Sequence, residues 1–475
     1  MLSFSSFDEA NAFLRARAIA MVDLKFCDLW GRWHHVTLPV KRFQPWLLER
    51  GVGFDGSALG FKPVKAGDML LVPDLAAAFI DPWCEVPTLS FICQSYEAST
   101  TRELFPYDPR NIAHRAEEHL RASGIADRSV WGPEFEFYLF DGVACENTVN
   151  TASYRVESSE GAWRARELGS GYTIPLRGGY HAVPPHDHLH NARTRIVLHL
   201  EAMGLDVKYH HHEVGGPGQC EIEIPLMPLL RATDAAMLVK YAARMTAIEL
   251  GLTATFLPKP LHGEAGSGMH YHQCLWQGDT NVFYDPGGYG RLSEIARQYI
   301  AGLLLHGGAV MALSNPSTNS YRRLVPGFEA PVSAFFSAGN RSAAIRVPKY
   351  ADRPESTRFE FRPPDATGNP YLSAAAQLLA GLDGIRRRLD PAQLGFGPVD
   401  EDIFTWPAAR RATIRALPTS LGQALDALEG DHTFLLEGQV FSTDLIERWL
   451  AKKRAEERDV LGRPHPYEVE LYYDL

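Results

Sequence analysis

The sequence predicts an α+β protein with a small N-terminal unit and a larger second domain. Its 475 residues are too many for one small hydrophobic core. Segments with the two-residue alternation of strands are mixed along the chain with segments of helical apolar spacing. The turn-rich stretch FPYDPR, at 105–110, separates a first group of these segments from the rest. We therefore expect domains at residues 1–104 and 105–475.

The N-terminal unit is expected to combine short strands with two short helices. Alternating segments at 22–27 and 33–38 are joined by DLWG, which predicts a hairpin. The glycine-rich stretch GVGFDGSALGF, at 51–61, holds one acid, Asp55, and lacks the spacing of a P-loop or a dinucleotide-binding fingerprint. The other predicted elements are helices at 7–19 and 42–49 and strands at 69–72 and 88–92.

In the larger domain, strands that carry charged side chains alternate with long helices. A strand–turn–strand unit is expected at 208–223, and single strands at 130–140, 253–256, 268–275, 343–346 and 358–362. Helical spacing predicts helices at 112–123, 188–202, 231–250, 295–313, 370–389 and 445–458. The most apolar window, 299–313, is interrupted by His306 and two glycines, so we expect a buried helix there and no membrane span.

The composition excludes several classes of protein. The chain is 45% hydrophobic and 22% charged, which is typical of globular domains. Its net charge of −10 argues against nucleic acid as a partner, since neutralising phosphates requires clustered basic residues. The first residues carry acids, Asp8 and Glu9, and lack the basic segment that begins a signal peptide, so we expect no signal peptide. Six cysteines without CxxC spacing indicate free thiols, and we expect a cytoplasmic location.

The unit at 208–223, KYHHHEVGGPGQCEIE, organises the rest of the sequence. Its first strand delivers Glu213, its second strand delivers Glu221 and Glu223, and a glycine-rich turn brings them together. Carboxylates crowded in this way repel one another unless cations lie between them. A hairpin face exposed to solvent is the simpler alternative.

Three further strands carry pairs of functional residues two apart, so that both members of each pair share one face. Glu134 and Glu136 could be metal ligands or an exposed polar face. His270 and His272 follow the flexible GSG at 266–268 and could be ligands or ordinary structural residues. In RFEFR, the Glu360 and Arg362 pair could be a simple salt bridge, or a ligand beside an anion clamp.

Together these clusters predict a metal-dependent reaction at phosphate. Glutamates with one or two histidines favour Mg²⁺ or Mn²⁺ over Zn²⁺. Arginine grips phosphate and carboxylate groups with two parallel hydrogen bonds, and carboxylate-bound metals beside arginines suggest phosphoryl transfer from a nucleotide. Glu329, in a loop rich in proline and glycine, is a candidate lid residue. The arginines are Arg322, Arg323, Arg341, Arg346, Arg358 and Arg362.

The chain resembles the type I glutamine synthetase family over nearly its whole length. Long motifs occur in the family's order, which makes the resemblance highly specific. They are FDGS (54–57), GPEFEFYLFD (132–141), GGYHAVPP (178–185), HHHEV and GQCEIE (210–223), TATFLPKP (253–260), GSGMHYH (266–272), NPSTNSYRRLVPGFEAPV (315–332), NRSAAIR (340–346), RFEFRPPDATGNPYL (358–372) and HPYEVELYY (465–473).

This resemblance implies a β-grasp N-terminal domain and a catalytic domain with a curved antiparallel sheet flanked by helices. It implies a homo-oligomer, a dodecamer of two hexameric rings, with active sites between neighbouring subunits and HPYEVELYY as an inter-ring strap. The implied activity is ATP-dependent ligation of ammonia to the γ-carboxylate of L-glutamate through γ-glutamyl phosphate. Two or three Mg²⁺ or Mn²⁺ ions per site would assist.

The family's residue roles carry over position by position. One metal would be bound by Glu136, Glu213 and Glu221, and another by Glu134, His270 and Glu360. ATP phosphates would contact His272, Arg346 and Arg358, with Arg341 at the transferred phosphate. Glutamate would be held by Arg323, Arg362 and the backbone of Gly266. Ammonium would be bound by Tyr180 and by Asp55 from a neighbouring subunit, with Glu329 closing the pocket.

Four positions depart from the family pattern. Ala265 stands where the family has an asparagine near the bound glutamate substrate. Ala58 stands in place of a serine, and Gly339 stands in place of an arginine. Phe404 falls where regulated relatives carry a tyrosine that is adenylylated, so that control is expected to be absent. The changes near the substrate permit a ligase that uses an amine, forming γ-glutamylamides, whereas Asp55 and Tyr180 favour ammonia. The complete set of predicted ligands argues against a catalytically silent relative.

Overall fold

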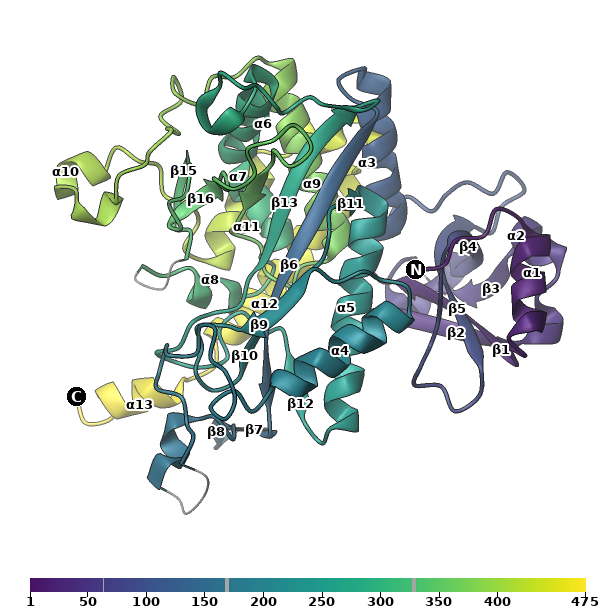
Figure 1. The fold of residues 1–475 in the computed structure, drawn as a ribbon, viewed down its shortest axis with the longest axis horizontal. Coiled ribbons are helices and arrows are strands. Elements are labelled where there is room, and N and C mark those ends of the chain that lie inside the picture. Colours follow the sequence, from purple (N-terminus) through teal and green to yellow (C-terminus); the bar gives the residue numbers. More distant parts are fainter. Residues whose placement is uncertain (63, 167–170, 327–329) are drawn as a thin grey trace.

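The N-terminal part of the computed structural model is a five-stranded sheet covered by two helices (Figure 1). The structure describes residues 1–62, 64–166, 171–326 and 330–475. The sheet order is β2-β1-β5-β4-β3, with β1 parallel to β5 and its other pairs antiparallel. The strands are β1 (Met21–Cys27), β2 (Trp33–Pro39), β3 (Val52–Asp55), β4 (Asp68–Ile80) and β5 (Thr88–Glu97), and the helices are α1 (Phe7–Ala16) and α2 (Pro45–Arg50).

The larger part is built on a ten-stranded sheet whose main path runs β15-β16-β17-β13-β6-β10-β9. Most of its pairs are antiparallel, and β6 also pairs with β11 and β12. The strands are β6 (Arg128–Phe140), β9 (Tyr209–His212), β10 (Gln219–Glu223), β11 (Met227–Pro228), β12 (Thr253–Thr255), β13 (Met269–Gln277), β14 (Thr280–Asn281), β15 (Ser333–Ser337), β16 (Ala343–Arg346) and β17 (Phe359–Phe361).

Helices pack against this sheet and leave two smaller helical segments projecting from the body (Figure 1). The projecting segments are α10 (Ala408–Arg411) and α13 (Pro466–Tyr472). The others are α3 (Pro109–Ser123), α4 (His190–Ala202), α5 (Leu229–Glu249), α6 (Glu294–Leu305), α7 (Gly307–Ser314), α8 (Ser320–Arg323), α9 (Pro370–Arg386), α11 (Leu421–Gly430) and α12 (Thr443–Leu461). None of the helices in the described part of the chain is long and apolar enough to cross a membrane.

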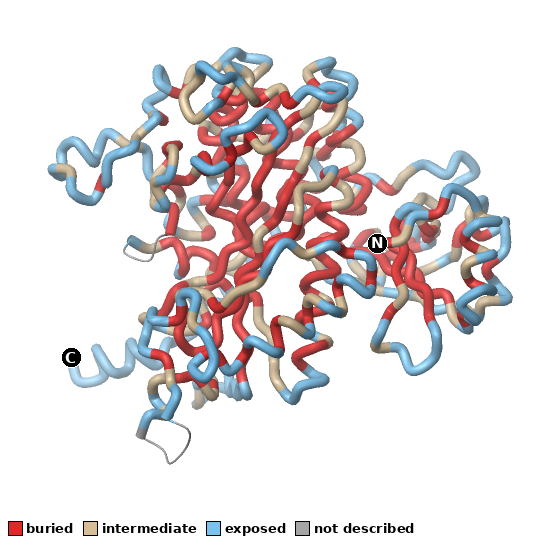
Figure 2. Tube along the Cα trace, in the orientation of Figure 1, coloured by how far each residue is buried: buried red, intermediate tan, exposed pale blue. Residues whose placement is uncertain are grey.

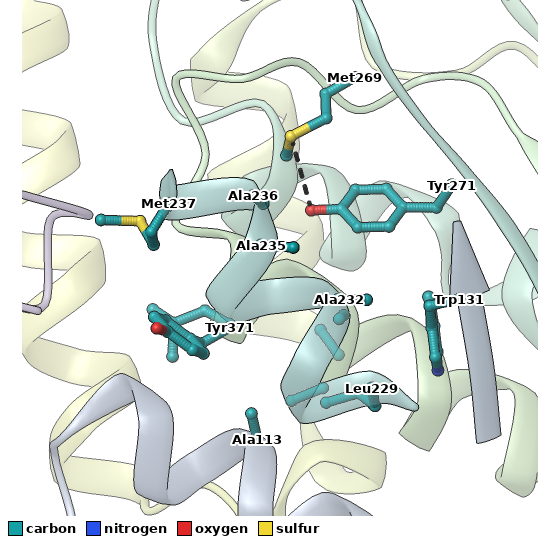
Figure 3. Packing of buried hydrophobic residues seen from close by; sticks show 14 of the residues in the cluster. Ala113, Trp131, Leu229, Ala232, Ala235, Ala236, Met237, Met269, Tyr271 and Tyr371 are labelled. Carbon is teal, nitrogen blue, oxygen red and sulfur yellow. Dashed lines mark hydrogen bonds between the residues drawn. The ribbon is translucent and has the colours of Figure 1, made fainter. Parts of the chain in front are cut away.

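The hydrophobic core lies between the sheet and helices α5 and α9, where Figure 2 shows mostly buried chain. Small residues on α5, including Ala232 and Ala236, allow close approach to aromatic residues from neighbouring elements (Figure 3). Trp131 of β6 and Tyr271 of β13 are 1% exposed and meet edge to face. One face of β6 and β13 therefore packs in the core. The alternate side chains of these strands point to the other face, where the site described below lies.

The structure differs from the predicted elements at several places, and it includes elements that were not predicted, such as β15 and α11. The segment 295–313 is two helices, α6 and α7, which meet at His306 instead of forming one continuous helix. An additional exposed hairpin, β7 (Gly142–Asn147) with β8 (Ala152–Glu157), was not predicted. Its residues are mostly solvent-exposed, so they lack the strong apolar alternation that marks a half-buried strand.

His306 connects three elements at the break between α6 and α7. Its ring nitrogens lie 2.8 Å from carboxylate oxygens of both Asp383, on α9, and Asp431, after α11. The ring also stacks on Phe434, with centroids 4.1 Å apart. Burial lowers the pKa of His306, but hydrogen bonds to the two aspartates outweigh burial and raise it above the usual value. The charged imidazolium is therefore the form that holds these elements together.

Arg110 is the second buried polar link, between the two parts of the chain. Its guanidinium donates to both carboxylate oxygens of Asp234 on α5, at 2.9 and 2.8 Å, and to Asp74 on β4 at 2.7 Å. Tyr371 donates to the same Asp234 at 2.7 Å. Arg110 and Asp234 are 2% and 0% exposed, so each depends on the other for its charge balance.

We expect the His306→Asn variant to lose stability at acidic pH but not at alkaline pH. A raised folded-state pKa means that the stabilisation is complete below about pH 6.5 and disappears as pH rises through the folded-state pKa. Melting temperatures of both proteins, measured from pH 6 to 9, should therefore converge with rising pH. The exposed His262→Asn change is the control, and a pH-independent difference for His306→Asn would contradict the prediction.

Replacing Arg110 with methionine should destabilise the protein by about 3–5 kcal/mol, because Asp234 would remain buried without its charged partner. Denaturant unfolding monitored by circular dichroism measures the change. The double variant Arg110→Met with Asp234→Asn should recover part of the loss. Arg463→Met, at an exposed ion pair on the C-terminal side of α12, should change stability by less than about 0.5 kcal/mol. Equal losses in both single arginine variants would refute the assignment.

Candidate active site

The pairing of β6 with β10 places glutamates directly opposite glutamates. Glu136 is opposite Glu221, and Glu134 is opposite Glu223. Like charges in opposing positions of a sheet destabilise it unless something compensates them. Glu136, Glu221 and Glu223 are between 3% and 8% exposed, which excludes the solvated-face alternative for these strands.

The next strands extend the same polar row. On β13, His270 is opposite Glu134, and His272 is opposite Glu360 of β17. Arg346 of β16 is opposite Glu360 on the other side. Residues two apart on five adjacent strands therefore point to one face of the sheet, as the period of two requires.

Ligand atoms from these strands converge in several groups of three, each within 4.8 Å. One group is Glu134, His270 and Glu360, the same trio that the family resemblance implies for one metal. Glu221 joins two others, one with Glu134 and Glu136 and one with Glu213 and a histidine that was not predicted, His211. His211 stands two residues before Glu213, so strand periodicity could have singled it out.

In one half of this carboxylate cluster repulsion between the acids prevails, although His211 lies 3.2 Å from Glu221 and 3.6 Å from Glu213. Burial raises the pKa of Glu213 well above its usual value, and the charges of Glu221 and Glu136 add to the effect. Burial and the charges of Glu134 and Glu136 do the same to Glu221. Oε2 of Glu213 is buried and accepts no hydrogen bond from the described residues. A divalent cation fits this oxygen-rich, negatively charged arrangement.

The other half is partly neutralised by the protein itself. Burial raises the pKa of Glu134, but hydrogen bonds from His270 and His272 outweigh it and bring the pKa well below the usual value. Glu360 behaves similarly, because ion pairs with Arg362 at 2.6 Å and Arg346 at 2.7 Å overcome the effect of burial. The Glu360–Arg362 pair is thus a buried salt bridge, and Glu360 also belongs to one of the groups of possible metal ligands.

A cavity of about 640 Å³ opens beside the carboxylates. Its wall combines glutamates with cationic and aromatic side chains, an arrangement that can hold an anionic substrate against metal ions. Ala265 and eleven of the predicted site residues line it; the eleven are Glu134, Glu136, Tyr180, Glu213, Glu221, Gly266, His270, Arg323, Arg341, Arg346 and Arg362.

Arg323 is held rigidly at the back of this cavity. It is 4% exposed and donates to the backbone oxygen of Pro363 at 2.9 Å and to Nε2 of His270 at 3.0 Å. A Cβ on Gly266 would lie 2.6 Å from Cγ of Arg323, so only glycine allows the loop to approach so closely. The sequence motif GSG therefore sets the shape of the wall.

Five predicted residues are not among the described lining residues, and one of them, Glu360, is fully buried beside Arg346 and Arg362. His272 is buried and does not line the cavity, and its Nε2 lies 3.4 Å from Oε2 of Glu134. The guanidinium of Arg358 lies 5.6 Å from the ring centroid of Tyr350, which lines the cavity. Asp55 is at the end of β3 in the N-terminal sheet, does not line the cavity, and has its pKa lowered by hydrogen bonds from Ser57. Glu329 lies outside the described residues.

The positions that depart from the family pattern have distinct surroundings. Ala265 lines the cavity, and its backbone oxygen accepts a hydrogen bond of 2.7 Å from Tyr138. Gly339 has φ of +101°, a conformation that side chains rarely adopt, so glycine fits this turn better than arginine would. Phe404 is 39% exposed, on the segment that leads to α10.

Comparison with known proteins gives matches across both parts of the chain. The family model described as the glutamine synthetase catalytic domain matches residues 106–472, and the β-grasp domain model matches residues 18–98. Proteins named glutamine synthetase from Streptomyces coelicolor and Frankia alni are each 46% identical over 99% of this chain and 100% of their own length. The relative from Aquifex aeolicus is 44% identical over 98% of this chain and 99% of its own.

Solved structures agree with this assignment. The structure of Plasmodium falciparum glutamine synthetase has a TM-score of 0.89 at 26% identity and covers 99% of both chains. A structure titled apo GmaS has a TM-score of 0.80 at 25% identity, over 98% of this chain and 99% of its own. The family resemblance and the β-grasp and catalytic architecture are confirmed. The chain belongs to the glutamine synthetase family.

Proposed function

We propose that this protein ligates ammonia to the γ-carboxylate of L-glutamate with hydrolysis of ATP to ADP and phosphate. The observation that carries the proposal is the convergence of buried glutamates and arginines on one cavity, in a chain that matches glutamine synthetases over its full length. Electrostatic stabilisation by such groups lowers the barrier to phosphoryl transfer.

The first step would be attack of the substrate γ-carboxylate on the terminal phosphate of ATP, giving γ-glutamyl phosphate and ADP. Arg323 and Arg362, with the backbone of Gly266, would hold glutamate by its carboxylates. Arg346, Arg358 and His272 would bind the ATP phosphates, and Arg341 the transferred phosphoryl group. Arg341 and Arg346 line the cavity, which supports this placement.

The second step would be attack of ammonia on the acyl phosphate, which releases phosphate and forms glutamine. Tyr180 lines the cavity and is 49% exposed, in a position to contact ammonium. Asp55 would take a proton from ammonium. Because Asp55 lies on the N-terminal sheet and away from the cavity wall of its own chain, we infer that it reaches the cavity of a neighbouring copy, in a ring-shaped homo-oligomer such as a dodecamer. Glu329 would cover the pocket.

Divalent metal ions fit two parts of the carboxylate cluster. The proposed ligands are Glu134, His270 and Glu360 at one position and Glu136, Glu213 and Glu221 at the other, with His211 beside the latter. Bound Mg²⁺ or Mn²⁺ would neutralise charge on the phosphates. The strands of the sheet position the glutamates, and the arginines neutralise the negative charge of the glutamates that face β16 and β17.

Ligation of an amine to glutamate is the second candidate function. The observation that favours it is that Ala265 lines the cavity, at the position where the family pattern has an asparagine. The acceptor would then be an amine with a side group that occupies this space, and the product a γ-glutamylamide.

Release of ADP should be fastest with ammonium as acceptor. The measurement compares ammonium with a panel of primary amines and polyamines at equal concentration, with glutamate and ATP at saturation. We expect kcat/KM for ammonium to exceed that for each amine at least tenfold, about 1.4 kcal/mol of barrier. An amine preferred by that margin would replace ammonia as the substrate. The Ala265→Asn variant should then lose activity with the amine and retain activity with ammonium.

Removal of one charge from the carboxylate cluster should stabilise the metal-free protein. In the presence of a chelator, Glu221→Gln relieves repulsion from Glu134 and Glu136 and should raise the melting temperature. Added Mg²⁺ or Mn²⁺ should raise the melting temperature of the wild type more than that of the variant.

The control for this comparison is Glu146→Gln, on the exposed hairpin strand β7. It removes the same charge from a site without crowded carboxylates, so neither its stability nor its response to metal should change. A metal response that is equal in wild type and Glu221→Gln would remove Glu221 from the proposed ligands.

A further inference from the structure

A second cavity, of about 460 Å³, lies between the N-terminal sheet and helix α5, outside the catalytic cavity. Strand β2 and the turn before it form one wall, and α5 forms the other. The lining residues are Lys25, Gly31, Arg32, Trp33, His34, His35, Met237, Lys240, Tyr241 and Arg244. This volume is in the range of pockets that bind small organic molecules, and no aspartate or glutamate is among these described lining residues.

Lys240 carries a buried charge at this cavity. It is 5% exposed, and its ammonium donates to the backbone oxygen of Ala366 at 2.7 Å. An ammonium has three donors, and a charge removed from water normally has an ionic partner. No described carboxylate lies within 4.0 Å of Lys240. Burial, with the nearby charge of Arg244, lowers the pKa of Lys240 to about 8.

The rim of the cavity adds two further cations. Arg244 follows Lys240 by one turn of α5, and like charges in this spacing repel each other. Arg32 is exposed on the opposite wall, in the turn just before β2. Within the described chain, neither arginine forms an ion pair with a carboxylate. By contrast, Lys25 is paired with both Asp23 and Asp81, His35 with Asp23, and His34 with Asp28, so these three side chains add no uncompensated positive charge.

Trp33 supplies an additional unused donor. Its indole Nε1 is buried and makes no hydrogen bond within the described residues. Its ring and that of Tyr241 lie 5.7 Å apart and, with Met237, give the cavity an apolar side. The cavity thus offers many donors and positive charges, few acceptors, and a surface suited to a short carbon chain.

We propose that this cavity binds a small organic anion with two acidic groups. One acidic group would accept hydrogen bonds from Lys240 and the indole of Trp33, and the other would lie between Arg32 and Arg244. The carbon chain would rest on Tyr241 and Met237. Carboxylate and phosphate groups share the required chemistry, since both accept several hydrogen bonds from cationic donors.

Calorimetric titration of the full-length protein tests the proposal, with succinate as the dicarboxylate probe and glycerol 3-phosphate as the phosphate probe. Inorganic phosphate and sulfate are left out of the buffer. We expect one site per chain for at least one probe, and the preferred probe identifies the acidic group. Binding should weaken at least tenfold in Arg244→Gln and in Lys240→Met, and Arg244→Lys should recover part of it.

Two variants serve as controls. Arg195→Gln removes the same charge from an exposed position on α4 and should bind the probe normally. Arg346→Gln alters the catalytic cavity and should also bind it normally. Binding that is lost in Arg346→Gln and retained in Arg244→Gln would place the anion in the catalytic cavity and overturn the proposal. Failure of both probes to bind at millimolar concentration would overturn it as well.

Stability provides an independent check on Lys240. If the charge of Lys240 serves to bind an anion, Lys240→Met should melt no lower than the wild type in the absence of the probe. The probe should then raise the melting temperature of the wild type and leave that of the variant unchanged. If Lys240 serves only to hold Ala366, the variant should melt lower, and the probe should leave the wild type unchanged. The second result would contradict the proposal.

Discussion

The pairing of β6 with β10 forces buried glutamates to face one another, and the rest of the molecule is arranged around this repulsion. Hydrophobic residues between the glutamates, such as Phe135 and Ile222, are fully buried on the other face of the sheet. Sliding the strands by one residue would expose them to the polar face, so burial fixes the register. The hydrophobic effect therefore holds the carboxylates together against their own charge.

The protein compensates this charge unevenly. Toward β16 and β17, arginines and histidines keep Glu134 and Glu360 ionised, and both have lowered pKa values. Toward β9, Glu213 and Glu221 have raised pKa values. The first region can remain charged by itself, while the second depends most on a cation from outside. The proposed metal binding would thus contribute to the stability of the central sheet as well as to catalysis.

The sequence predicted much of this site, because a period of two residues is enough to place Glu134 with Glu136 and His270 with His272 on one face. It could not show which strands are neighbours, since the pairing of β6 with both β10 and β13 joins segments far apart in the chain. The break at His306 escaped prediction for the same reason. Its aspartate partners lie 77 and 125 residues further on, so local helical spacing gave no sign of them.

If Asp55 takes part in proton transfer as proposed, its position means that a single chain leaves the cavity incomplete. Asp55 ends the edge strand β3, whereas the cavity opens on the face of another sheet. The buried Arg110 network ties β4 of the N-terminal sheet to α3 and α5, which opposes any movement of Asp55 toward its own cavity. A role for Asp55 in proton transfer therefore requires a second copy of the chain. Assembly would then bring Asp55 of one copy to the cavity of its neighbour. The Arg110 network between the two parts of each chain would fix how far Asp55 lies from its own cavity, and so how neighbouring copies must be placed.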